Sequence, residues 1–93
     1  MFEIVVSCSG LPESMARDAI AEILEESSQR TWHENVICWW EGDLLYLRVR
    51  NDCDVDGSAL AHEFSDVVCA CTPIQDEIAV SVVSVAVIPG SDA

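Results

Sequence analysis

The stretch VICWWEGDLLYLRVR, residues 36–50, decides the fold predicted from this sequence. Two runs rich in β-branched and aromatic residues flank Gly42 and Asp43. A glycine followed by a second turn-forming residue between two such runs is typical of a two-residue hairpin turn, here of type II′. The stretch therefore predicts two antiparallel strands, residues 36–41 and 44–50.

The register of this hairpin separates a buried face of the sheet from an open face. The turn places Trp40 opposite Leu45 and Trp39 opposite Tyr46. Successive side chains of a strand point to opposite faces, so every second residue from Leu45 onward is expected to meet the helices. The open face then carries aromatic, arginine and aliphatic side chains from all four strands: Trp39, Tyr46, Arg48 and Arg50, with Glu3, Val5, Val83 and Val85.

The rest of the chain supplies two more strands and two helices. Residues 2–7 and the valine-rich residues 78–88 predict strands, and apolar residues spaced three and four apart predict helices at about 12–29 and 58–71. The order β, α, β, β, α, β predicts an α+β, ferredoxin-like sandwich, a four-stranded antiparallel sheet with both helices on one face. The expected core includes six apolar side chains: Ile20, Ile23, Leu24, Leu47, Phe64 and Val67.

The length of 93 residues predicts one domain over residues 1–93, ordered to about residue 89. The first residues have the pattern of a strand and not of a signal peptide. No apolar run approaches the roughly 20 residues that a membrane span needs. We therefore expect a cytoplasmic protein without membrane contact.

The charge of this chain is its most unusual bulk property. Seventeen acidic residues against four arginines give a net charge of −13, although 51% of the residues are apolar. A disordered acidic tail lacks core-forming residues, whereas this chain has them, so we expect a folded domain with a strongly negative surface. Affinity for nucleic acid depends on basic residues, and direct nucleic-acid binding is therefore not expected.

Five acidic residues on one face of the 12–29 helix lead to the main functional hypothesis: Glu13, Asp18, Glu22, Glu25 and Glu26. Carboxylates on a rigid helix can stand in for DNA phosphates, and long-range attraction speeds the capture of a positively charged nuclease site. The hypothesis is a small non-enzymatic inhibitor, of the immunity, antitoxin, anti-restriction or anti-CRISPR type, that binds a basic protein partner which handles nucleic acid. Large exposed apolar patches seldom stay uncovered, so the open sheet face is a second predicted contact surface, for a homodimer or for the partner.

The alternative hypothesis is a dimeric ferredoxin-like regulatory or ligand- or metal-sensing domain. Its binding site would lie at the loop after the first strand, residues 7–10, or within residues 52–63. The sequence offers no convergent acid, base and nucleophile, so neither enzymatic activity nor a cofactor is expected.

A calcium-loop pattern, D-x-[DN]-x-[DN]-G-x5-E, is matched in full by five residues: Asp52, Asp54, Asp56, Gly57 and Glu63. The context differs from that of a calcium loop, because a strand precedes the pattern and Leu60 stands where a ligand or a water-orienting residue is needed. We expect Asp54 or Asp56 to cap the 58–71 helix instead. The metal site at these acidic residues is kept as an alternative.

The cysteines and histidines add no motif. Five cysteines without a CxxC pair predict free, mostly buried thiols. The sequence places no partner beside His33, and His62 forms an ordinary helix pair with Asp66, four residues later.

Overall fold

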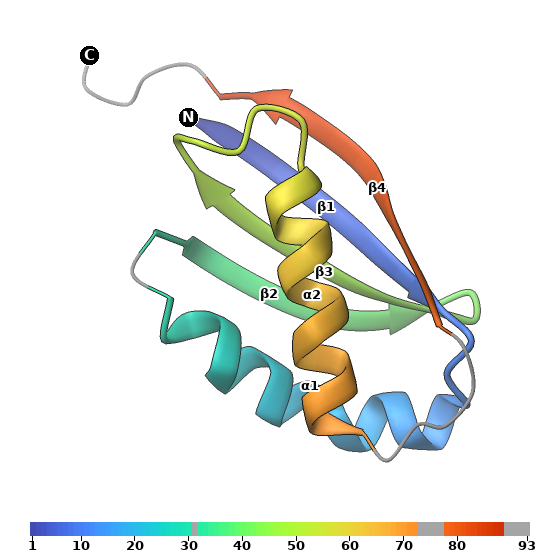
Figure 1. Cartoon of the computed structure of the whole chain (residues 1–93). Helices are drawn as coiled ribbons and strands as arrows, with labels where there is room; N and C mark the ends of the chain where they lie inside the picture. Colours follow the sequence, from blue (N-terminus) through green and yellow to red (C-terminus); the bar gives the residue numbers. More distant parts are fainter. Residues whose placement is uncertain (31, 73–77, 89–93) are drawn as a thin grey trace.

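The computed structural model describes residues 1–30, 32–72 and 78–88 of the chain. Its elements are β1 (Phe2–Ser9), α1 (Glu13–Ser28), β2 (Glu34–Glu41), β3 (Leu44–Asn51), α2 (Ser58–Cys71) and β4 (Ala79–Val87). The four strands form one antiparallel sheet in the order β2-β3-β1-β4. Both helices cover the same face of this sheet (Figure 1). The predicted ferredoxin-like fold is confirmed.

The hairpin between β2 and β3 has the predicted register but a different turn. Trp40 lies opposite Leu45 and Trp39 opposite Tyr46. The turn residues have φ angles of 57° at the glycine and 67° at Asp43. Two positive φ angles define a type I′ turn, so the prediction of type II′ was wrong. An aspartate tolerates this left-handed conformation, which is why the second turn position does not need a glycine.

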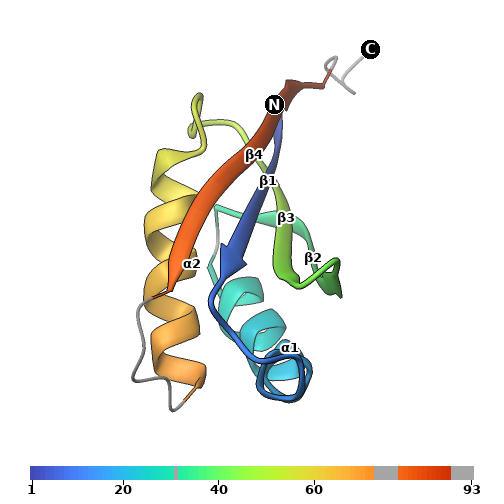
Figure 2. The same cartoon turned by 90° about the vertical axis from the view of Figure 1, so that its right-hand side faces the viewer.

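The core lies between the sheet and the two helices. Figure 2 shows this layer from the side, with α1 and α2 on one side of the strands. Among the predicted core residues, Ile23, Leu47, Phe64 and Val67 are buried, and Ile20 and Leu24 are half-buried and pack against the core. The latter two lie at the margins of the apolar stripe of α1. Neither α1 nor α2 is long and apolar enough to cross a membrane.

The start of α2 approaches the sheet closely at Gly57. Its φ of 78° is left-handed, and a Cβ there would lie 2.9 Å from Cγ1 of Val82 and 3.1 Å from Cγ2 of Ile4. Two aspartates before the helix accept hydrogen bonds from its first backbone N–H groups. Asp54 accepts from Ala59 and Leu60, and the other, Asp56, accepts from Ser58.

Strand β4 departs from the predicted alternation. The pairing with β1 shifts between Val5 and Val6, and Val83 is the extra residue at this bulge. Beyond the bulge, Val85 lies opposite Ile4 and packs against the core. The prediction that Val85 lies on the open face was therefore wrong. The open face of β4 instead carries small residues: Ser81, Ser84 and Ala86. Residue 89, where order was expected to end, lies outside the described residues.

Candidate functional site

A cleft of about 260 Å³ opens at the end of the sheet where β2 begins and β3 ends. Five residues line it: Met1, Trp32, Glu34, Asn51 and Asp52. The hairpin pairing brings the start of β2 beside the end of β3, so residues 19 positions apart in sequence meet here. The chain changes direction on both sides of the cleft, at Trp32 before β2 and at Asp52 after β3.

Asn51 is the buried polar residue of this cleft, with only 1% of its surface exposed. Its Oδ1 accepts the backbone N–H groups of Cys53, at 3.3 Å, and Asp54, at 3.0 Å. These two donors fix the orientation of the amide, since only the oxygen can accept them. Its Nδ2 is buried and has no hydrogen-bond acceptor among the described residues. A buried donor without a partner costs about 1–3 kcal/mol of stability, so an acceptor that reached Nδ2 would stabilise the protein.

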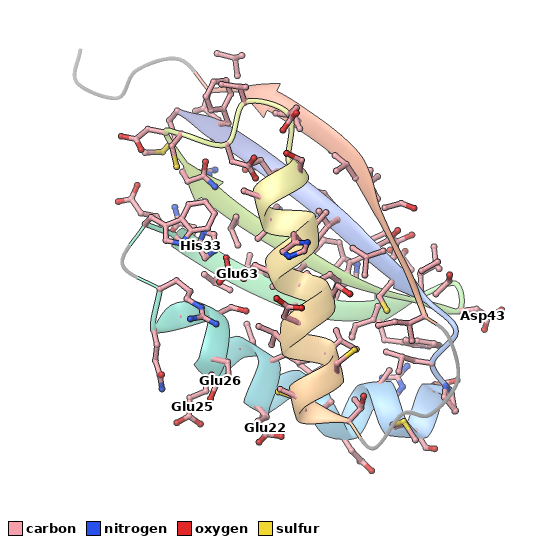
Figure 3. All side chains as sticks on the ribbon, in the orientation of Figure 1. Glu22, Glu25, Glu26, His33, Asp43 and Glu63 are labelled. Carbon is pink, nitrogen blue, oxygen red and sulfur yellow. The ribbon has the colours of Figure 1, made fainter. Side chains whose placement is uncertain are left out.

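A charged cluster beside the cleft joins α2 to the segment between α1 and β2. Nε2 of His33 lies 2.9 Å from Oε2 of Glu63, and Oε1 of the same carboxylate lies 2.7 Å from Nε of Arg30. The imidazole is fully buried, and its ring lies 3.9 Å from the indole of Trp32. Figure 3 shows the imidazole and the carboxylate side by side between α2 and the start of β2.

This cluster gives the cleft a fixed wall. The buried His33 holds the chain against α2, and the neighbouring Trp32 packs against it at the cleft, with an angle of 39° between the two rings. This arrangement has no local signal in the sequence, because His33 and Glu63 are 30 residues apart and no helix or strand spacing relates them. The cleft thus combines an aromatic surface, a buried amide donor and two carboxylates. These groups are suited to binding a ligand.

The acidic residues of the predicted calcium loop are not brought together. Asp52 lines the cleft, Asp54 and Asp56 accept bonds from the start of α2, and Glu63 pairs with the arginine and histidine described above. The bond from the backbone N–H of Ser58, followed by that from its hydroxyl, lowers the pKa of Asp56. Across residues 1–30, 32–72 and 78–88, no three or more His, Cys, Asp and Glu side chains are grouped to hold a metal ion.

The five acidic residues predicted to contact a partner lie exposed on α1: Glu13, Asp18, Glu22, Glu25 and Glu26. The side chains of the last three project away from the protein (Figure 3). Glu13 pairs with Arg17 at 2.7 Å, which neutralises part of this surface. A second hollow, of about 330 Å³, lies between the start of α1 and the end of α2, where Asp18 and Cys71 are among its lining residues.

The structure places the four predicted residues of the open face together on that face. Trp39 and Tyr46 stack with ring centroids 5.1 Å apart and an angle of 11° between their planes. Arg50 forms an ion pair with Glu3 at 3.1 Å. Arg48, between Ile37 and Val5 in the sheet, has no ion pair within the described part of the chain.

The five cysteines are free thiols, of which only Cys8 and Cys38 are buried. The prediction that most of them are buried was therefore wrong. Burial raises the pKa of Cys8 to about 11 and that of Cys38 to about 12. Partial burial, with Glu22 and Glu26 nearby, also raises the pKa of Cys71.

No protein-family model matches this chain, and no curated protein is significantly similar to it. Among solved structures, it is similar to one described as a crystal structure of antibiotic biosynthesis monooxygenase. The TM-score is 0.53, the likeness covers 96% of this chain and 100% of the other, and 12% of the residues are identical. At this identity, the likeness shows a shared fold.

This comparison contradicts the prediction of an acidic inhibitor that blocks a basic partner. The protein that shares the fold along its whole length is described as a monooxygenase and not as an inhibitor. The alternative prediction, a ferredoxin-like regulatory or ligand-sensing domain, agrees better with this finding. The expectation that the chain is not an enzyme gains no support from it.

Proposed function

We propose that this chain is a ferredoxin-like, ligand-sensing domain that binds a small molecule in the cleft at the end of β2 and β3. One observation carries the proposal. The buried Nδ2 of Asn51 has no acceptor among the described residues, and Asn51 lines the cleft. A bound molecule with an acceptor would satisfy this donor and recover the stability that it costs the unliganded protein.

The size of the cleft favours a compact ligand. Ligand pockets enclose about 300–1,000 Å³, and this cleft, at about 260 Å³, lies just below that range. Its lining is more polar than that of a usual ligand pocket, because three of its five residues, Glu34, Asn51 and Asp52, are polar. A molecule of one or two rings fits these limits.

The second hollow is a weaker site although it is larger. Two buried side-chain atoms have neither a hydrogen-bond partner nor an ion-pair partner among the described residues: Nδ1 of His33 and Nδ2 of Asn51. Neither belongs to a residue that lines the hollow beside Cys71. The unsatisfied polar groups therefore gather at and behind the first cleft.

The proposal includes a homodimer formed through the open sheet face. This face carries the stacked Trp39 and Tyr46 and the half-exposed Ile37, a combination of aromatic and aliphatic groups that is enriched in protein interfaces. Two of the four arginines of the chain, Arg48 and Arg50, also lie there. Two copies with a charge of −13 repel each other. This repulsion is weakest where the arginines of one copy lie close to acidic residues of the other.

The experiment for the binding function is a thermal-shift screen of the full chain against aromatic fragments that are neutral, cationic or anionic. Fragments that bind the cleft should raise the melting temperature of the wild type and lose this effect in Trp32→Leu. They should keep it in Met15→Leu, a volume-conserving change at the second hollow. The function is contradicted if no fragment stabilises the wild type, or if the two variants behave alike.

A further inference from the structure

The charge of the cleft selects the kind of molecule that can enter it. Its lining includes the exposed carboxylates of Glu34 and Asp52, no arginine, and Met1, which carries the α-ammonium group of the chain. The nearest arginines in the sequence are engaged elsewhere, since Arg30 pairs with Glu63 and Arg50 pairs with Glu3. In a chain of net charge −13, an anion is repelled from this site and a cation is attracted.

The indole of Trp32 adds a flat surface to these carboxylates. Tryptophan is the best aromatic partner for a cation, which is attracted to the negative face of its ring. The ring is partly buried, and its contact with the imidazole of His33 at 3.9 Å limits its movement. A planar molecule can stack on the exposed part of this surface.

The amide of Asn51 would stay unsatisfied with a bare metal ion as the sole occupant. Its Nδ2 can only donate a hydrogen bond, and a metal ion has no acceptor for it. The occupant therefore needs a hydroxyl, carbonyl or ring-nitrogen acceptor. The two carboxylates and the indole favour an occupant with a positive charge and a flat ring. The amide favours an occupant with a hydrogen-bond acceptor.

From these three features we infer that the cleft recognises a small aromatic amine that carries a hydrogen-bond acceptor. This inference rests on the proposed ligand-sensing function and names the chemical class of its ligand. The ammonium group lies against the carboxylates of Glu34 and Asp52, the ring lies on Trp32, and the acceptor receives the Asn51 N–H.

Isothermal titration calorimetry with four related probes tests the inference on the full chain. Tyramine has the ring, the ammonium group and a hydroxyl acceptor. Phenethylamine lacks the hydroxyl, tyrosol replaces the ammonium group with a neutral alcohol, and 3-(4-hydroxyphenyl)propionate replaces it with an anion. We expect tyramine to bind at least about tenfold more tightly than tyrosol, about fivefold more tightly than phenethylamine, and the anion not to bind.

Two double variants with the same change in net charge separate a local effect from a general one. Glu34→Gln with Asp52→Asn should weaken tyramine binding by about tenfold and leave tyrosol unchanged. Glu22→Gln with Asp18→Asn, on the exposed face of α1, should leave both affinities as in the wild type.

Each contrary result has its own meaning. If tyrosol binds as tightly as tyramine, or if both double variants weaken tyramine equally, the inferred ligand class is wrong while the cleft remains a binding site. If none of the four probes binds, the inferred class is likewise wrong, and the fragment screen then decides the function separately. Tight binding of Ca²⁺ alone, lost in the Glu34 and Asp52 double variant, would replace the amine with a metal ion.

Discussion

Nε2 of His33 lies 2.9 Å from Oε2 of Glu63, and this contact fastens the segment before β2 to α2. The other oxygen of the same carboxylate lies 2.7 Å from Nε of Arg30, just beyond the end of α1. One carboxylate of α2 thus holds two residues, three positions apart, of the stretch between α1 and β2. The proposed cleft depends on it, because Trp32 packs against the imidazole that this carboxylate holds.

Glu63→Gln should lower the free energy of unfolding by about 1–3 kcal/mol. The substitution keeps the shape of the side chain but removes the charge that balances Arg30, and leaves His33 with a neutral partner. Urea denaturation monitored by tryptophan fluorescence measures the change. Asp66→Asn is the matched control, since Asp66 lies on the same helix in an exposed pair with His62 at 4.0 Å. It should change stability by less than about 0.5 kcal/mol, and an equal effect of the two variants would refute the structural role of Glu63.

Gly57→Ala should destabilise the chain more than Gly42→Ala does. Both glycines have positive φ angles, so each alanine costs about 1–2 kcal/mol for the left-handed backbone. At Gly57 the new methyl group would also lie 2.9 Å from Val82, whereas nothing lies within 4 Å at Gly42. Crowding adds about 1–3 kcal/mol at the first position alone. Equal losses in denaturant titrations of the two variants would show that α2 does not approach β4 as described.

Stability should fall between pH 9 and pH 12 because of Cys8 and Cys38. Burial raises the pKa of these thiols to about 11 and about 12, whereas the thiols of the unfolded chain ionise near pH 9.0. Above pH 9, the unfolded state therefore binds fewer protons, and the stability present below pH 9 is lost as the pH rises through the folded pKa values. Denaturant midpoints across this range should fall less steeply in the Cys8→Ala, Cys38→Ala double variant. Cys53→Ala, at an exposed position, should leave the pH dependence of the midpoint as in the wild type. The assignment to Cys8 and Cys38 would be contradicted if their double variant kept that same pH dependence.

The proposed dimer makes Ile37 and Trp39 sensitive positions. Ile37→Ser with Trp39→Ser should increase the dissociation constant of the dimer by at least about tenfold, as measured by sedimentation equilibrium. Val55→Ser is the control, because Val55 is 67% exposed but lies in the loop before α2. A wild type that stays monomeric at all concentrations, or a control with the same effect, would rule out pairing through the open sheet face.

The fold was predictable from local patterns in the sequence. The Gly42 and Asp43 turn fixes the register of the hairpin, and the apolar spacing around Ile23 and Phe64 fixes the buried faces of the helices. Even so, the alternation rule failed in β4, where the bulge at Val83 turns Val85 toward the core. A single extra residue reverses the faces of a strand, and the unbroken run of valines in this segment gives no sign of it.

The candidate site was far less predictable. Asp52 appeared in the sequence analysis as one member of a calcium pattern, but the structure separates it from the other acidic residues of that pattern. No sequence pattern relates Asn51 to Trp32, because their proximity comes from the pairing of β2 with β3. His33 and Glu63 meet only through the packing of α2 on the sheet. Sequence spacing reports contacts within an element, whereas this cleft is built from contacts between elements.

The most direct test of the proposed binding function is a ¹H–¹⁵N correlation spectrum of the full chain, recorded with and without a mixture of neutral, cationic and anionic aromatic fragments. If the cleft binds one of them, the side-chain amide of Asn51 and the indole N–H of Trp32 should shift together and saturably. The indole signals of Trp39 and Trp40, away from the cleft, should not move with them. If the signals of Asn51 and Trp32 stay in place while the mixture shifts residues elsewhere or none, the cleft is not a binding site and the proposed function is wrong.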